Sequence, residues 1–170
     1  MKRINFLVRG AMIAALYAAI TIVFAPISYY LAQVRISEAL TVLAYFEPAA
    51  IPGLFVGCVL ANIYGGLGPW DIFGGSFLTL IAAYLTWKIR KPILALLPPV
   101  VINAIGIAFM LKYILGIPDA LKVSYPIAIL YIGAGQTVAV YCLGYPLLLF
   151  LLRRKLFVRA DVLARKLGSG

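Results

Sequence analysis

Histidine is missing from this chain of 170 residues, and acidic residues number only five. The lack of histidine removes the most common general base and a frequent metal ligand. Charged residues make up only 12% of the chain, whereas soluble domains average about 25%. These shortages argue against an enzyme, against a metal centre and against a soluble globular fold.

Cysteine is also scarce. Cys58 and Cys142 each lie alone inside an apolar stretch, which is not a metal-ligand spacing. Free cysteines are among the most frequently buried residues, so both are expected to pack as small hydrophobic side chains. The sequence therefore predicts neither a bound metal nor a cofactor.

Apolar and aromatic residues are abundant, at 65% of the chain. A helix needs roughly 20 apolar residues to cross about 30 Å of hydrocarbon, so this length allows five or six membrane spans and no soluble catalytic domain. The charged residues separate uncharged runs at 10–34, 39–46, 48–70, 72–87, 92–111 and 123–152. The composition predicts an all-α integral membrane protein.

Basic residues set the predicted topology. They gather in three clusters: Lys2, Arg3 and Arg9; Lys88, Arg90 and Lys91; and Arg153, Arg154 and Lys155. Cytoplasmic segments carry an excess of Lys and Arg, so an even number of crossings should separate each pair of clusters. That condition requires the short segment 36–46 to cross. We therefore predict a six-transmembrane-helix bundle over residues 1–152, with both termini cytoplasmic, in a prokaryotic cell membrane; the net charge of +10 then reflects topology and not nucleic-acid binding.

Residues 153–170 form a basic tail with apolar residues at helical spacing. Such a pattern predicts an amphipathic cytoplasmic extension on anionic lipid, with docking to a partner as the alternative. The last three residues, 168–170, are expected to be a cloning remnant.

The first span carries two stripes of small residues. One contains Gly10, Ala14 and Ala18, and the other contains Ala11, Ala15 and Ala19. Small residues four apart let helix backbones approach closely within a bilayer. One stripe could pack inside the protein while the other receives a separate subunit.

Polar residues within or beside the apolar runs form a candidate ligand site. Its members are Arg35, Glu38, Asn62, Trp70, Asp71, Asn103 and Gln136. Each has a structural alternative: an ion pair for Arg35 and Glu38 at a spacing of three, an N-cap for Asp71, and interhelical hydrogen bonds for the carboxamides. Together they suit a flat, nitrogen-rich, cationic ligand. Glu47 is assigned instead to an inner turn or to subunit contact.

Several motifs resemble those of one transporter family. RISEAL at 35–40, EPAAIPGLFVGC at 47–58, Ala61–Asn62 and LPPVVINA at 97–104 are similar to successive blocks of the QueT family. The resemblance implies the substrate-binding (S) component of an energy-coupling factor (ECF) transporter, with six helices, an outward-facing pocket and no ATPase of its own. It also implies a transmembrane T component and two cytoplasmic ABC ATPases as partners.

The resemblance implies a cargo and a partner surface as well. The cargo would be a queuosine precursor, a 7-deazaguanine such as 7-aminomethyl-7-deazaguanine. The family's small-residue motif facing the T component matches Ala11 and Ala15, or Ala15 and Ala19 in the other register. The alternative is a self-sufficient secondary carrier or small channel for a cationic or nucleobase-like solute, which the few intramembrane acids and the lack of internal repeats disfavour.

Overall fold

The computed structural model describes residues 2–29, 34–114 and 124–154, and every regular element within these ranges is helical. Three helices are long and apolar enough to cross a membrane: Arg3–Val23, Leu94–Ile114 and Tyr125–Arg154. The all-helical prediction is confirmed for the described residues, and the apolar helices fit a membrane protein. Of the predicted tail at 153–170, the first two residues continue the last helix, which ends at Arg154, and residues 155–170 lie outside the described residues.

The first half of the chain contains one long helix followed by shorter segments. These are α1 (Lys2–Val23), α2 (Ala25–Ser28), the 3₁₀ helix η1 (Ile36–Val42), α3 (Leu43–Phe46) and α4 (Ala50–Gly65). The helix α1 ends before Pro26, which lies in the first turn of α2. Because a 3₁₀ helix rises about 2.0 Å per residue, against 1.5 Å in an α-helix, Ile36–Phe46 reaches about 20 Å instead of about 16 Å. The 3₁₀ geometry thus gives the short segment 36–46 a greater length than an α-helix would.

The second half alternates α-helical with 3₁₀ or π-helical stretches. In order they are η2 (Asp71–Gly75), α5 (Ser76–Lys88), η3 (Leu94–Leu96), α6 (Leu97–Phe109), η4 (Met110–Ile114), α8 (Tyr125–Thr137), η5 (Val138–Gly144) and α9 (Tyr145–Arg154). Prolines lie in the first turns of α6 and α8, where proline is tolerated. Ser124 occupies the N-cap position of α8, but its side chain makes no capping hydrogen bond.

The last helix is interrupted just before Pro146. Pro146 cannot donate a backbone hydrogen bond to the preceding turn. The chain is π-helical over Val138–Gly144 and returns to α-helix at Tyr145. The irregularity therefore occupies the turns before Pro146.

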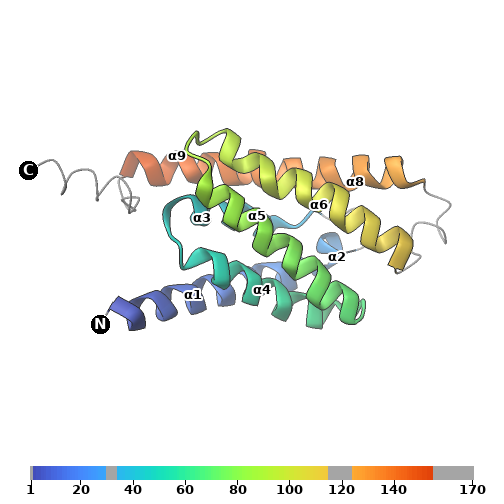
Figure 1. The fold of residues 1–170 in the computed structure, drawn as a ribbon, viewed down its shortest axis with the longest axis horizontal. Coiled ribbons are helices and arrows are strands. Elements are labelled where there is room, and N and C mark those ends of the chain that lie inside the picture. Colours follow the sequence, from blue (N-terminus) through green and yellow to red (C-terminus); the bar gives the residue numbers. More distant parts are fainter. Residues whose placement is uncertain (1, 30–33, 115–123, 155–170) are drawn as a thin grey trace, which may run out of the picture.

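Successive helices run back and forth along the long axis of the molecule (Figure 1). The helix α1 packs mainly on α4, α5 lies between α4 and α6, α6 packs on α8, and η1 contacts α1 and η5. The start of α1, the α3–α4 turn, the α5–α6 connection and the end of α9 lie at one end of the molecule, and the α4–α5 turn lies at the other (Figure 1). We call the first end the basic end, because the described residues of all three basic clusters belong to elements that meet there.

The two small-residue stripes of α1 have different surroundings. Gly10, Ala14 and Ala18 are buried, whereas Ala11, Ala15 and Ala19 are exposed. The buried stripe faces glycines of α4: a Cβ built on Gly53 would lie 2.6 Å from the Gly10 carbonyl oxygen, and one on Gly57 would lie 2.8 Å from that of Ala14. Only glycine allows the two backbones to pack this closely.

Glu47 joins these elements at the basic end. Its carboxylate accepts a hydrogen bond from Arg9 on α1 and a weaker one, at 3.4 Å, from the backbone of Ala49. Glu47 therefore holds the α3–α4 turn against α1, which agrees with the turn role predicted from the sequence.

Candidate functional site

Six of the seven candidate site residues are buried inside the helix bundle. Their side chains are at most 1% exposed: Arg35, Glu38, Asn62, Asp71, Asn103 and Gln136. Trp70 is the exception, at 63% exposed, and it lies outside the buried group. Polar groups are costly in such an interior unless they find hydrogen-bond partners, so the partners of each side chain are informative.

Three of the six residues lie at irregular helical stretches, and the other three lie on α-helices. Arg35 is the N-cap of η1 and Glu38 lies in its first turn. Asp71 begins the π-helical stretch η2, and Asn62 lies on the last turn of α4 opposite it. Since α6 packs along α8, Asn103 and Gln136 face each other.

The first set of contacts centres on Asn62, and we call it the Asn62 cluster. Arg35 Nη2 donates to Asn62 Oδ1 at 2.9 Å, and Asn62 Nδ2 donates to the Asp71 carbonyl oxygen at 2.9 Å. Arg35 also lies over the Tyr29 ring, 5.6 Å from its centroid, and its Nη1 contacts Cys58 Sγ at 3.5 Å. Two polar atoms of this cluster have no hydrogen-bond partner: Arg35 Nε and Asp71 Oδ2.

Two structural alternatives raised by the sequence are not found. In the described part of the chain, the charged atoms of Arg35 and Glu38 form no ion pair within 4.0 Å, because the guanidinium turns toward Asn62 and the carboxylate toward Tyr17. Asp71 is not an N-cap either: it is the first residue of η2, whose N-cap is Trp70, and the Asp71 Oδ2 atom is buried without a hydrogen-bond partner.

The second set centres on Glu38, and we call it the Glu38 cluster. Tyr17 on α1 donates its hydroxyl hydrogen to Glu38 Oε1 at 2.5 Å. Asn103 Nδ2 donates to Gln136 Oε1 at 3.4 Å, and the Asn103 side chain interacts with the Glu38 carboxyl group. Three buried atoms in this cluster have no partner: Glu38 Oε2, Asn103 Oδ1 and Gln136 Nε2.

The two carboxamides make this cluster chemically versatile. Each carboxamide carries both a donor and an acceptor. Asn103 and Gln136 each use one amide group in the hydrogen bond that joins them. One NH2 group and one carbonyl oxygen of the pair therefore have no partner, and this count is the same if both amides are flipped. With Glu38 Oε2, the cluster offers two acceptors and one donor to any molecule that enters it.

The QueT transporter family matches residues 7–153. The chain belongs to the QueT family. No curated protein and no solved structure gives a significant match. Membership of the QueT family, together with the apolar helices, identifies a membrane transport protein and indicates a role other than catalysis.

Tyr17 is a residue of this QueT-family protein that the sequence analysis missed. It is completely buried and is the partner of Glu38. It follows Gly10 and Ala14 at helical spacing, so the stripe of small residues could have indicated that it also faces the interior.

The predicted burial of the cysteines is half correct. Cys58 is buried, and its sulfur contacts Arg35 and Thr79 at 3.5 Å each. Cys142 is exposed, so its predicted burial is wrong. It lies in η5, where the changed helical phase turns its side chain outward.

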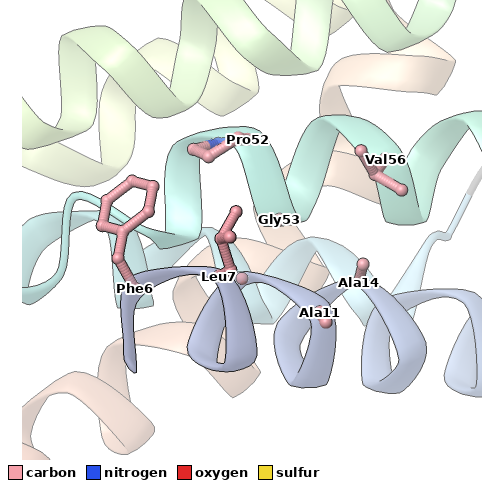
Figure 2. A pocket seen from close by; sticks show the side chains of 8 residues that line it. Phe6, Leu7, Ala11, Ala14, Pro52, Gly53 and Val56 are labelled. Carbon is pink, nitrogen blue, oxygen red and sulfur yellow. The ribbon is translucent and has the colours of Figure 1, made fainter. Parts of the chain in front are cut away.

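A shallow apolar groove runs between α1 and α4 near the basic end of this QueT-family protein. Its volume is about 230 Å³, and Ala11 forms part of its wall. Figure 2 shows Phe6 at one end of the groove and Val56 at the other. The predicted partner residues Ala11, Ala15 and Ala19 thus lie on an accessible face of α1, whereas most of the predicted ligand residues lie inside.

Proposed function

We propose that this protein is the substrate-binding (S) component of an ECF-type ABC importer and that it binds a queuosine precursor, a 7-deazaguanine such as 7-aminomethyl-7-deazaguanine. The observation that carries the proposal is the group of unpartnered buried atoms in the Glu38 cluster. A buried polar atom without a partner destabilises a fold by about 1–3 kcal/mol. Three such atoms on the side chains of one cluster favour a ligand that completes their hydrogen bonds.

A guanine-like edge has the complementary pattern. It presents two N–H donors, from the ring and the exocyclic amine, and one carbonyl acceptor. Glu38 Oε2 and the free carboxamide oxygen would accept from the two donors, and the free carboxamide N–H would donate to the carbonyl. Hydrogen bonds to a carboxylate are stronger than neutral ones, so Glu38 should contribute most to affinity.

The Asn62 cluster suits the other end of the same ligand. Asp71 Oδ2 is an unpartnered carboxylate oxygen, which would pair with the ammonium of an aminomethyl group. Tyr29 adds an aromatic face to this region, although Arg35 already lies over it. Arg35 also partly offsets the attraction of Asp71 for a cation, so this contact should be weaker than that of Glu38.

The exposed face of α1 supports the partner half of the proposal. Ala11, Ala15 and Ala19 form a stripe where another helix backbone could approach closely. We assign this stripe to a transmembrane T component, which would connect the protein to two cytoplasmic ABC ATPases. ATP hydrolysis would then occur in those subunits.

The distribution of charge supports six membrane spans with both termini cytoplasmic. The basic end collects the start of α1, the end of α5 and the end of α9 (Figure 1), as expected for the cytoplasmic side. A single cysteine introduced at Lys91, in a chain whose own cysteines are replaced, should react with a membrane-impermeant maleimide only after the cells are opened. Labelling of intact cells would contradict this topology.

Substitution of Glu38 tests the ligand. Glu38→Gln should weaken binding of 7-aminomethyl-7-deazaguanine to the detergent-solubilised protein about tenfold or more, because it removes a charge-assisted hydrogen bond. Isothermal titration calorimetry measures the change. Glu47→Gln is the matched control, since it makes the same substitution at the basic end and should leave the affinity unchanged. Unchanged affinity in a folded Glu38→Gln variant would exclude Glu38 as a ligand contact.

Transport assays test the assembly. Vesicles that contain this chain alone should not accumulate the ligand, and vesicles that also contain the T component and the ATPases should accumulate it when ATP is supplied. Accumulation by the chain alone, driven by an ion gradient, would favour the secondary-carrier alternative.

A further inference from the structure

Tyr17 has a more specific place in the site than a general packing residue. Its side chain is 0% exposed and lies in an apolar cluster with residues of α4 and α5. On α4, a Cβ at Gly57 would lie 2.8 Å from the Tyr17 Cβ atom. This tight packing fixes the ring, and the ring in turn fixes the direction of the hydroxyl group.

The hydroxyl group holds one oxygen of Glu38 and leaves the other free. Tyr17 donates to Glu38 Oε1 at 2.5 Å, while Glu38 Oε2 is buried without a partner. A free carboxylate on a flexible side chain would sample several rotamers and would lose entropy on binding a ligand. With one oxygen fixed, the carboxylate is oriented before the ligand arrives.

We propose that Tyr17 is a positioning residue for the ligand: it holds Glu38 so that Oε2 is directed to the substrate. This inference rests on the proposed function. Tyr17 itself need not touch the ligand, because it acts through the Glu38 carboxylate.

A neighbouring hydrogen bond offers a matched control. One turn further along α1, Thr21 shares a hydrogen bond with Ser37 of η1 at 2.6 Å, and both residues are buried. Thr21→Val and Tyr17→Phe each remove one side-chain hydrogen bond between α1 and η1. Only Tyr17→Phe removes a bond to the carboxylate.

The test measures binding of 7-aminomethyl-7-deazaguanine by isothermal titration calorimetry, with thermal unfolding recorded for each variant. Tyr17→Phe should weaken binding about tenfold, and Thr21→Val should change it less than about twofold. In the Glu38→Gln background, Tyr17→Phe should cause no further loss, because Tyr17 acts only through that carboxylate. If Tyr17 had a purely structural role, both variants would be less stable. Tyr17→Phe would then weaken binding in the Glu38→Gln background as much as it does in the unmodified protein.

A second comparison keeps the test decisive if Tyr17→Phe does not fold. At position 17, 4-aminophenylalanine keeps a donor at the end of the ring and should retain binding, whereas 4-fluorophenylalanine has similar size without the donor and should lose it. Equal binding by these two variants would overturn the role of Tyr17. Failure of the unmodified protein to bind the ligand would instead overturn the proposed function, and the role of Tyr17 with it.

Discussion

Ala14 and Ala15 are adjacent in the chain and identical in chemistry, yet they lie in opposite environments on α1. Ala14 is 4% exposed and packs against α4 at Gly57, whereas Ala15 is exposed. The difference shows that a small residue takes its role from the surface opposite it. Glycines on α4 pack against one stripe of α1, and the other stripe is accessible.

The largest expected effect on stability comes from the buried stripe. Gly57→Ala places a Cβ 2.8 Å from the Ala14 carbonyl oxygen and from the Tyr17 side chain, so α1 and α4 must separate. Overpacking of this kind should lower the free energy of unfolding by about 3 kcal/mol, measured by denaturation in detergent. Gly133→Ala is the control: its Cβ would lie 3.4 Å from the Ala104 Cβ, an ordinary contact, and stability should change little. Alanine favours a helix more than glycine does, so equal losses in the two variants would mean that close approach of α1 and α4 does not set the cost.

A substitution in the exposed stripe should lower transport and leave stability unchanged. Ala15→Trp should lower ATP-driven uptake by the assembled transporter about tenfold or more, because a bulky side chain keeps two helix backbones apart. Ligand affinity and thermal stability of the isolated protein should stay unchanged, since Ala15 touches neither α4 nor the buried clusters. If affinity and uptake fall together, the two faces of α1 are not separate in function.

The smallest effect on stability is expected at the ion pair near the start of α1. Arg9 pairs with Glu47, but the Arg9 side chain is 57% exposed. Exposed ion pairs contribute about 0–1 kcal/mol, so Arg9→Gln should shift the thermal midpoint only slightly, and added salt should reduce the difference further. A loss comparable to that of Gly57→Ala would show that this pair, and not the glycine contact, holds α1 in place.

Much of the fold could be predicted from charge and proline positions. The uncharged runs between charged residues predicted where helical segments lie, whereas the six crossings stay a prediction. The prolines in the first turns of α6 and α8 mark the starts of these helices. These signals are local or additive, so one sequence is enough to find them. Six of the seven polar candidates are buried in the structure, where polar groups need hydrogen-bond partners; their role in binding a ligand stays a prediction.

The contacts between helices could not be predicted. The π-helical stretches at η2, η4 and η5 shift which side chains face inward, and their positions depend on packing against other helices. The partner of Glu38 is likewise Tyr17, from a different helix, whereas sequence spacing favoured Arg35. Spacing along one helix identifies a shared face, but it does not show which neighbour meets that face.

The glycine contacts between α1 and α4 also have a mechanical consequence. Close approach at Gly53 and Gly57 leaves α1 and α4 little room to move relative to each other, so we expect them to move as one rigid unit. This unit carries Tyr17 and Asn62, whereas the α6–α8 pair carries Asn103 and Gln136. A tilt of the α1–α4 unit would therefore change the distance between Tyr17 and the two carboxamides without any helix having to unwind.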